Sequence, residues 1–122
     1  MESPFKGKTG IKRLINALGY SLKGFKSAYK HEDAFRQEVL MAIVMLPLAI
    51  YLGHNGIDRA LLAGSVILVL IVELVNSSIE ATVDYISIDY HQLAARAKDI
   101  GSAAVLLSLT NMALIWALVI LS

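Results

Sequence analysis

The stretch ALLAGSVILVLIVELVNSSIEATVD, residues 60 to 84, begins as an uninterrupted apolar run and then acquires carboxylates. A helix that crosses a bilayer needs about 20 predominantly apolar residues, and this stretch is long enough. An ionisable side chain inside such a span is energetically costly, so its presence indicates a function. Glu73, Asn76 and Glu80 are therefore the first candidates for a functional site.

The composition of the chain is that of a membrane protein. Of its 122 residues, 57% are hydrophobic and 17% are charged, whereas about 25% of the residues of a typical soluble domain are charged. The chain has no cysteine, which excludes a disulfide framework and thiolate chemistry. We do not expect a cleavable signal peptide, because Lys12, Arg13 and Asn16 interrupt any apolar core near the N-terminus.

Two further stretches reach spanning length. IGSAAVLLSLTNMALIWALVIL, residues 100 to 121, carries no charge, and VLMAIVMLPLAIYLG, from Val39, is long enough if its helix starts near Ala34. Tyr51 and Trp116, toward the outer ends of their spans, are predicted to be interfacial anchors. We predict an all-α membrane protein with a single membrane-embedded domain, residues 1–122, whose long helices cover about 34–53, 59–84 and 90–121.

Residues 9–30 have a different pattern. Apolar residues recur at helical spacing from Ile11 to Tyr29, while Lys and Arg occupy the remaining surface. This pattern is typical of a basic amphipathic helix in the headgroup region of a membrane. The alternative is an ordinary helix packed on a soluble core. We favour the surface helix, because the chain offers so little soluble sequence to pack on.

The distribution of Lys and Arg predicts the orientation in the membrane. Eight of the eleven precede the first apolar core, Arg96 and Lys98 lie in the second linker, and only Arg59 lies in the first. Since cytoplasmic loops are enriched in Lys and Arg, the N-terminus and the second linker should be cytoplasmic. The C-terminus should then face outward.

The polar residues of the second span form a stripe. Glu73, Asn76, Ser77, Glu80 and Asp84 have the spacing of one helix face. Carboxylates near one another suit Mg²⁺, which typically takes one or two of them together with phosphate oxygens. Glu73 lies deepest, and burial makes a carboxylate a stronger base, suited to taking a proton from a substrate hydroxyl. The alternative is a stripe that only joins helices by hydrogen bonds, but two Glu and an Asp favour a site.

Two other functions have little support in the sequence. GYSLKGFKS, from Gly19, departs from the phosphate-loop pattern because Phe25 intervenes and the surroundings are helical. No nucleic-acid signature is present, since the basic residues alternate with membrane-facing apolar ones.

VELVNSSIEATVD, AFRQE and RAKDIGSAAVLL resemble the signature segments of the small bacterial integral-membrane diacylglycerol kinases. GYSLKGFKSAY lies where that family carries its surface helix, and the resemblance covers nearly the whole chain from Lys12 on. It implies Mg²⁺- and ATP-dependent phosphorylation of diacylglycerol to phosphatidic acid at the bacterial inner membrane. It also implies a homotrimeric bundle whose active sites are shared between neighbouring chains.

The same resemblance implies roles for individual residues. The general base falls on Glu73, the metal-holding carboxylates on Glu32 and Glu80, and a supporting polar partner on Asn76. The implied ATP contacts are Arg13, Tyr20, Glu32, Glu80, Asp89, Tyr90, His91, Lys98 and Asp99. The implied lipid-side contacts are Ser21, Glu73, Ser102 and Trp116. The sequence departs from the family at Leu22, Gln92 and Ala95, where Trp, Glu and Gly are more usual, which leaves the acid and metal positions intact.

Two alternatives to a diacylglycerol kinase stay open. By resemblance, the same architecture also serves undecaprenol, but EDAFRQE and GYSLKG resemble the diacylglycerol version more. The alternative from another class is a non-enzymatic membrane cation carrier. A carrier needs polar groups in both halves of the membrane, and the outer halves here are nearly free of ions.

Overall fold

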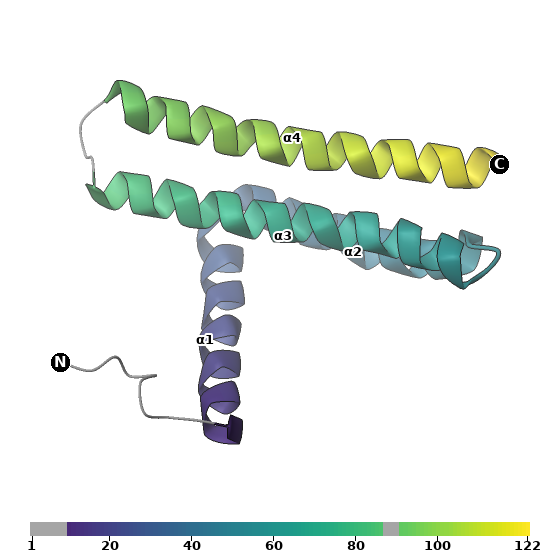
Figure 1. Cartoon of the computed structure of the whole chain (residues 1–122), viewed down its shortest axis with the longest axis horizontal. Helices are drawn as coiled ribbons and strands as arrows, with labels where there is room; N and C mark the ends of the chain where they lie inside the picture. The colour runs from purple at the N-terminus through teal and green to yellow at the C-terminus, as the bar shows by residue number, and fades with distance from the viewer. Residues whose placement is uncertain (1–9, 87–90) are drawn as a thin grey trace.

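The computed structural model describes residues 10–86 and 91–122, which form four helices. They are α1 (Gly10–His31), α2 (Asp33–Leu52), α3 (Gly56–Ile86) and α4 (Gln92–Leu121). The helix α3 packs against both α2 and α4, and α1 runs crosswise to these three long helices (Figure 1). The predicted all-α class is confirmed, with its separate N-terminal helix.

The three long helices are each long and apolar enough to cross a membrane. The 20 residues of α2 correspond to about 30 Å, which is the thickness of the hydrocarbon layer. With 31 residues, α3 is longer, so it continues past the start of α2 at the end of the bundle where α1 lies (Figure 1). It also begins earlier than residue 59, because the Asn55 Oδ1 atom accepts a hydrogen bond from the Asp58 N–H at 2.9 Å and caps its first turn.

The buried face of α3 changes character along its length. Buried side chains recur every three or four residues, which places them on one face. From Leu62 to Val69 this face is mostly apolar and packs with Ala42, Ala49 and Met112 in the core. From Glu73 on, its buried side chains are polar. The apolar half holds the helices together, and the polar half lies toward α1.

Trp116 joins α4 to α3 within the apolar half of the bundle. Its Nε1–H donates to the Leu62 carbonyl and to Ser65 Oγ, both at 3.1 Å. The residue is 8% exposed, so the prediction that it is an interfacial anchor is wrong. The sequence correctly placed Trp116 toward the outer end of its span. It did not show that Trp116 faces α3 and is buried there. Tyr51, which is 83% exposed, lies on the surface as an anchor would.

A single residue, Glu32, joins α1 to α2, and Arg36 holds this corner. The Arg36 Nη1 group donates to the carbonyls of Tyr29, at 2.7 Å, and Lys30, at 2.9 Å. These carbonyls belong to the last turn of α1, where helix hydrogen bonds are missing. Glu32 itself has an extended backbone, and its N–H donates to the Ala28 carbonyl. The corner therefore fixes the position of the Glu32 side chain.

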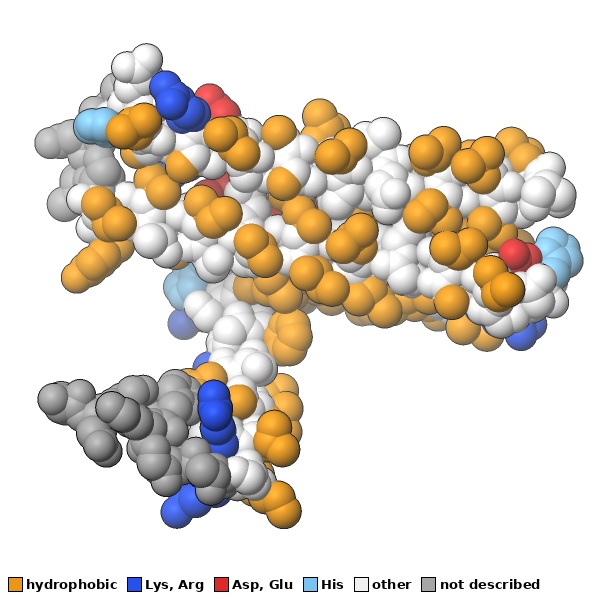
Figure 2. Space-filling view, in the orientation of Figure 1, with side chains coloured by type: hydrophobic (Ala, Val, Ile, Leu, Met, Phe, Trp, Pro, Cys, Tyr) orange, Lys and Arg blue, Asp and Glu red, His pale blue; other side chains and the backbone are white. Residues whose placement is uncertain are grey.

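The helix α1 has no buried residue, and its two sides differ in chemistry. Its large apolar side chains, such as Leu14, Leu18 and Leu22, are exposed. They lie on the side facing the α2–α3 turn, with Lys and Arg opposite (Figure 2). A helix lying crosswise to a membrane bundle in this way inserts its apolar side into the bilayer and keeps its cations in water. The predicted amphipathic surface helix is confirmed.

Candidate active site

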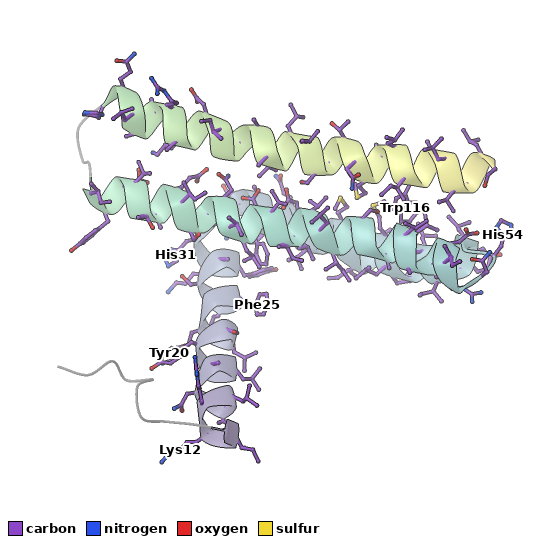
Figure 3. All side chains as sticks on the ribbon, viewed as in Figure 1. Lys12, Tyr20, Phe25, His31, His54 and Trp116 are labelled. Carbon is purple, nitrogen blue, oxygen red and sulfur yellow. The ribbon has the colours of Figure 1, made fainter. Side chains whose placement is uncertain are left out.

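A cleft of about 550 Å³ lies between α1 and α3. Its α1 wall includes Ser21, Phe25 and His31, its corner is Glu32, and its α3 wall includes Ser77. Phe25 and His31 mark the α1 wall in Figure 3. The cleft lies where the surface helix meets the long helices, so apolar side chains and a carboxylate border the same space.

Glu73 lies behind the α3 wall of this cleft. It is 4% exposed, and one of its oxygens, Oε1, accepts a hydrogen bond from Ser77 Oγ at 3.4 Å. Ser77, one helical turn further along, borders the cleft directly. Ser77 therefore contacts both the buried Glu73 carboxylate and the cleft.

Three other carboxylates surround Glu73. Glu38 from α2, Glu32 from the corner and Glu80 from α3 are close enough to repel it electrostatically. Within residues 10–86 and 91–122, no salt bridge compensates any of the four. Two of the four, Glu38 and Glu73, are buried, and buried carboxylates without a salt bridge in a membrane protein indicate a functional site.

The sequence predicts Glu38 at the membrane interface, at the same mouth of the bundle as the polar stripe, and gives it no role, whereas the structure buries it. Its side chain is 8% exposed, and its Oε2 atom is buried without a hydrogen-bond partner. A signal was available: Glu38 has helical spacing with Phe35 and Ala42, which are also buried. Phe35, Glu38 and Ala42 therefore mark one inward face of α2, which places Glu38 inside the bundle.

Several of the predicted ATP contacts gather at the end of the bundle where α3 stops and α4 begins. Lys98 Nζ of α4 lies 2.6 Å from Asp84 Oδ1 of α3, and Glu80 is close enough to attract the Lys98 ammonium group. His91 Nδ1 accepts a hydrogen bond from the Leu93 N–H at 3.1 Å and so caps α4. Asp99 is exposed on the same helix. Asp89 and Tyr90 lie outside the described residues.

The structure does not bring the other predicted ATP contacts to the same place. Arg13 and Tyr20 are exposed on α1. Arg13 follows Lys12, which Figure 3 places at the end of α1 far from the long helices. Tyr20 is nearer the middle of α1, where Lys23 Nζ lies 5.7 Å from its ring centroid. Within one chain, Arg13 therefore does not join Lys98.

The predicted lipid-side contacts are also divided. Ser21 borders the cleft, and its Oγ donates to the Ala17 carbonyl at 3.0 Å. Ser102 is exposed on α4, and Trp116 is buried in the other half of the bundle; neither borders the cleft. In a single chain, only Ser21 of this set borders the cleft, and Glu73 lies behind its wall, hydrogen-bonded to Ser77.

Glu32 and Glu80, the predicted metal ligands, carry the oxygen donors that Mg²⁺ prefers. Among the described residues, no group of three or more His, Cys, Asp or Glu side chains has the arrangement of a metal site. Glu32 and Glu80 nevertheless provide hard carboxylate oxygens, both residues are half-buried, and both act electrostatically on Glu73. Because Mg²⁺ usually completes its shell with water and substrate phosphates, two protein carboxylates are enough.

Three helices long and apolar enough to cross a membrane, an amphipathic helix and a carboxylate cluster beside a cleft define an integral-membrane protein with a candidate active site. The family model described as prokaryotic diacylglycerol kinase matches residues 19–120. The chain is 51% identical over 119 residues to the diacylglycerol kinase of Pseudomonas aeruginosa, covering 98% of this chain and 97% of that protein. It is 46% identical over 114 residues to the diacylglycerol kinase of Escherichia coli, covering 93% of each. The chain belongs to the prokaryotic diacylglycerol kinase family.

Membership in this family makes the protein an ATP-dependent lipid kinase. The predicted resemblance is confirmed, and the alternative of a cation carrier is set aside.

We predict that Glu38→Gln stabilises the fold. The change removes one of two buried like charges and keeps the size of the side chain, and relief of active-site strain of this kind is typically worth about 0.5–2 kcal/mol. The measurement is the midpoint of thermal unfolding in one detergent at mildly alkaline pH. Glu73→Gln is the matched comparison, and because the two carboxylates repel each other, the double variant should gain less than the sum of the two single gains. A lower midpoint for Glu38→Gln would mean that a favourable contact holds this carboxylate.

Proposed function

We propose that the protein transfers the γ-phosphate of ATP to the primary hydroxyl of diacylglycerol, giving phosphatidic acid and ADP. The observation that carries the proposal is the position of Glu73, buried beside Ser77 at a cleft between the surface helix and α3. A lipid whose chains lie in the bilayer can bring its hydroxyl to this cleft from the side. The relatives named as diacylglycerol kinases support the choice of substrate.

In the proposed reaction, Glu73 takes the proton of the substrate hydroxyl. The oxygen of that hydroxyl then forms a bond to the γ-phosphorus, and the bond from this phosphorus to the bridging oxygen of ADP breaks. The Ser77 hydroxyl orients the carboxylate through the hydrogen bond to Oε1.

Glu32 and Glu80 would hold Mg²⁺ in this proposal. The ion, when bound, neutralises the charge of the phosphate oxygens. Asn76 supports the arrangement, because its Nδ2 group donates to Glu80 Oε1 at 3.1 Å. Lys98, His91 and Asp99 belong to the nucleotide side, and we assign Asp89, Tyr90, Arg13 and Tyr20 to it as well.

We further propose that the enzyme is a homotrimer with shared active sites. The support is that Lys12, the neighbour of Arg13, lies at the end of α1 far from the long helices (Figure 3), so Arg13 could join the nucleotide side only in a neighbouring chain. The basic side of α1 supports a cytoplasmic N-terminus, in agreement with the count of Lys and Arg. The protein would then lie in the bacterial inner membrane with its C-terminus in the periplasm.

The test of the function is phosphate transfer from radiolabelled ATP in mixed micelles. We expect purified protein to phosphorylate diacylglycerol with a higher kcat/KM than undecaprenol, measured side by side in the same micelles. A clear preference for undecaprenol would overturn the substrate and leave the kinase chemistry standing. Absence of transfer to either lipid would overturn the proposal as a whole.

We predict that Glu73→Gln lowers kcat by about 10²- to 10⁴-fold, which is the usual contribution of a general base. Nucleotide binding should be largely spared, because the amide keeps the shape of the side chain and no ATP contact is assigned to Glu73. The measurements are kcat with diacylglycerol and the dissociation constant of a non-hydrolysable ATP analogue. Near-normal kcat would remove Glu73 from the mechanism.

We predict that Glu32→Gln and Glu80→Gln each raise the Mg²⁺ concentration needed for half-maximal activity, because affinity for the ion depends on the number of carboxylates. The measurement is a Mg²⁺ titration at fixed ATP. Asp58→Asn is the matched control, since Asp58 lies at the other end of α3. Unchanged titrations for both Glu variants would refute the metal assignment.

Subunit mixing tests whether the sites are shared. We predict that inactive Glu73→Gln subunits and Glu32→Gln subunits, unfolded and reassembled together, regain part of the activity when assayed at a Mg²⁺ concentration too low to activate Glu32→Gln alone, because some shared sites would contain both native carboxylates. The control is each variant reassembled alone. If mixed assemblies form, as judged by co-purification of two different tags, yet stay inactive, then each site is contained in one chain.

A further inference from the structure

Gly101 of α4 lies directly against the Asn76 side chain of α3. It is one of the buried residues of α4. A Cβ atom built at position 101 would overlap Asn76 Oδ1 and would lie 3.2 Å from Asn76 Cγ. The Cα hydrogen that takes the place of this Cβ therefore points at Oδ1, as in a weak Cα–H···O contact.

The contact bears on the orientation of the Asn76 amide. Nδ2 donates to Glu80 Oε1 at 3.1 Å, and Oδ1 is buried without a conventional hydrogen-bond partner among the described residues. An unpaired buried acceptor typically costs about 1–3 kcal/mol. The Asn76 amide keeps this orientation because the reverse one would direct Oδ1 at the Glu80 carboxylate, where two acceptors would repel each other. With a hydrogen at position 101, the amide fits between α4 and Glu80.

We propose that Gly101 is a positioning residue for the Glu80 carboxylate, acting through Asn76. A side chain at position 101 would displace the Asn76 amide, which is the movable group at this contact, and would break its hydrogen bond to Glu80. The carboxylate would then lose the donor that fixes its orientation. This inference rests on the proposed role of Glu80 in holding Mg²⁺.

The experiment uses Gly101→Ala in the full-length protein, with Gly64→Ala as control, because a Cβ at position 64 meets open space. Loss of a group that orients a metal ligand usually weakens metal affinity 10- to 100-fold. We expect Gly101→Ala to raise the half-saturating Mg²⁺ concentration about tenfold, with kcat at saturating Mg²⁺ within about twofold of the native value. Gly64→Ala should leave both unchanged.

The Asn76→Ala background separates positioning from packing. There, Gly101→Ala has no amide to displace, so it should cause no further rise in the Mg²⁺ requirement. An equal rise in both backgrounds, or no rise in the native one, would overturn the role of Gly101. If Glu80→Gln leaves the Mg²⁺ titration unchanged, the metal assignment itself fails, together with the role that we give Gly101 in it. A shift for Glu80→Gln without one for Gly101→Ala overturns only the Gly101 inference.

A measurement without metal or ATP tests the contact itself. In EDTA, Gly101→Ala should lower the thermal unfolding midpoint in the native background and not in the Asn76→Ala background, where the methyl group fills the vacated space. Additive effects would refute the contact. If Gly101→Ala does not fold, recovery of folding in the double variant supports the inference, and continued failure overturns it.

Discussion

Glu73 is buried on the same face of α3 that carries Leu62, Val66 and Val69, without a salt bridge to any described residue. A charged side chain at the bilayer centre is unfavourable by about 2.5–3.5 kcal/mol even by the lowest estimates, and a carboxylate buried nearer the interface carries part of this penalty. Packing elsewhere in the bundle has to offset this penalty. Helices in lipid associate by close packing and hydrogen bonds, because the surrounding chains are as apolar as the helix surfaces. The small residues Ala42 and Ala49 in the core, together with the two hydrogen bonds of Trp116, supply both kinds of contact at the opposite half of α3.

The corner between α1 and α2 brings the surface helix to the same place. A long loop there would leave Glu32 free to sample many positions, and fixing it would cost conformational entropy. The structure has a one-residue joint instead, with Arg36 bound to the last carbonyls of α1. Because this joint is short, Glu32 and the α1 wall of the cleft are positioned together. The order of the cleft therefore depends on a guanidinium group that has no part in the proposed chemistry.

The sequence predicted the parts of this structure that depend on local periodicity. The spacing from Glu73 to Glu80 was enough to place a polar stripe on α3, and the alternation from Ile11 to Tyr29 was enough for the surface helix. Trp116 was misplaced because its position near the end of a span says nothing about which way it faces. The face could have been read from Gly101, Ser108 and Met112, which share it.

Other features were beyond the reach of periodicity. That the Glu38 carboxylate faces Glu73 depends on how α2 is rotated against α3, and this rotation is a tertiary property. The displacement of Arg13 from Lys98 depends on the direction of α1, which a helical pattern does not contain. The proposed sharing of a site between copies of the chain cannot be tested by periodicity either, because no single sequence pattern records which groups of two chains meet.

Glu73 and Glu80 lie at different depths along α3, and each depth suits one of the two proposed substrates, the lipid and the nucleotide. At 1.5 Å per residue from Gly56, Glu73 lies about 26 Å along the helix and Glu80 about 36 Å. If Gly56 lies at one face of the hydrocarbon layer, which is about 30 Å thick, then Glu73 is just inside the other face and Glu80 is beyond it. A lipid hydroxyl reaches the first depth, whereas a triphosphate stays in the aqueous headgroup region at the second. In the proposed mechanism, one helix that continues past the bilayer would provide both the base for the lipid and a carboxylate for the nucleotide, two turns apart on the same face. The crosswise α1 borders the cleft at that level.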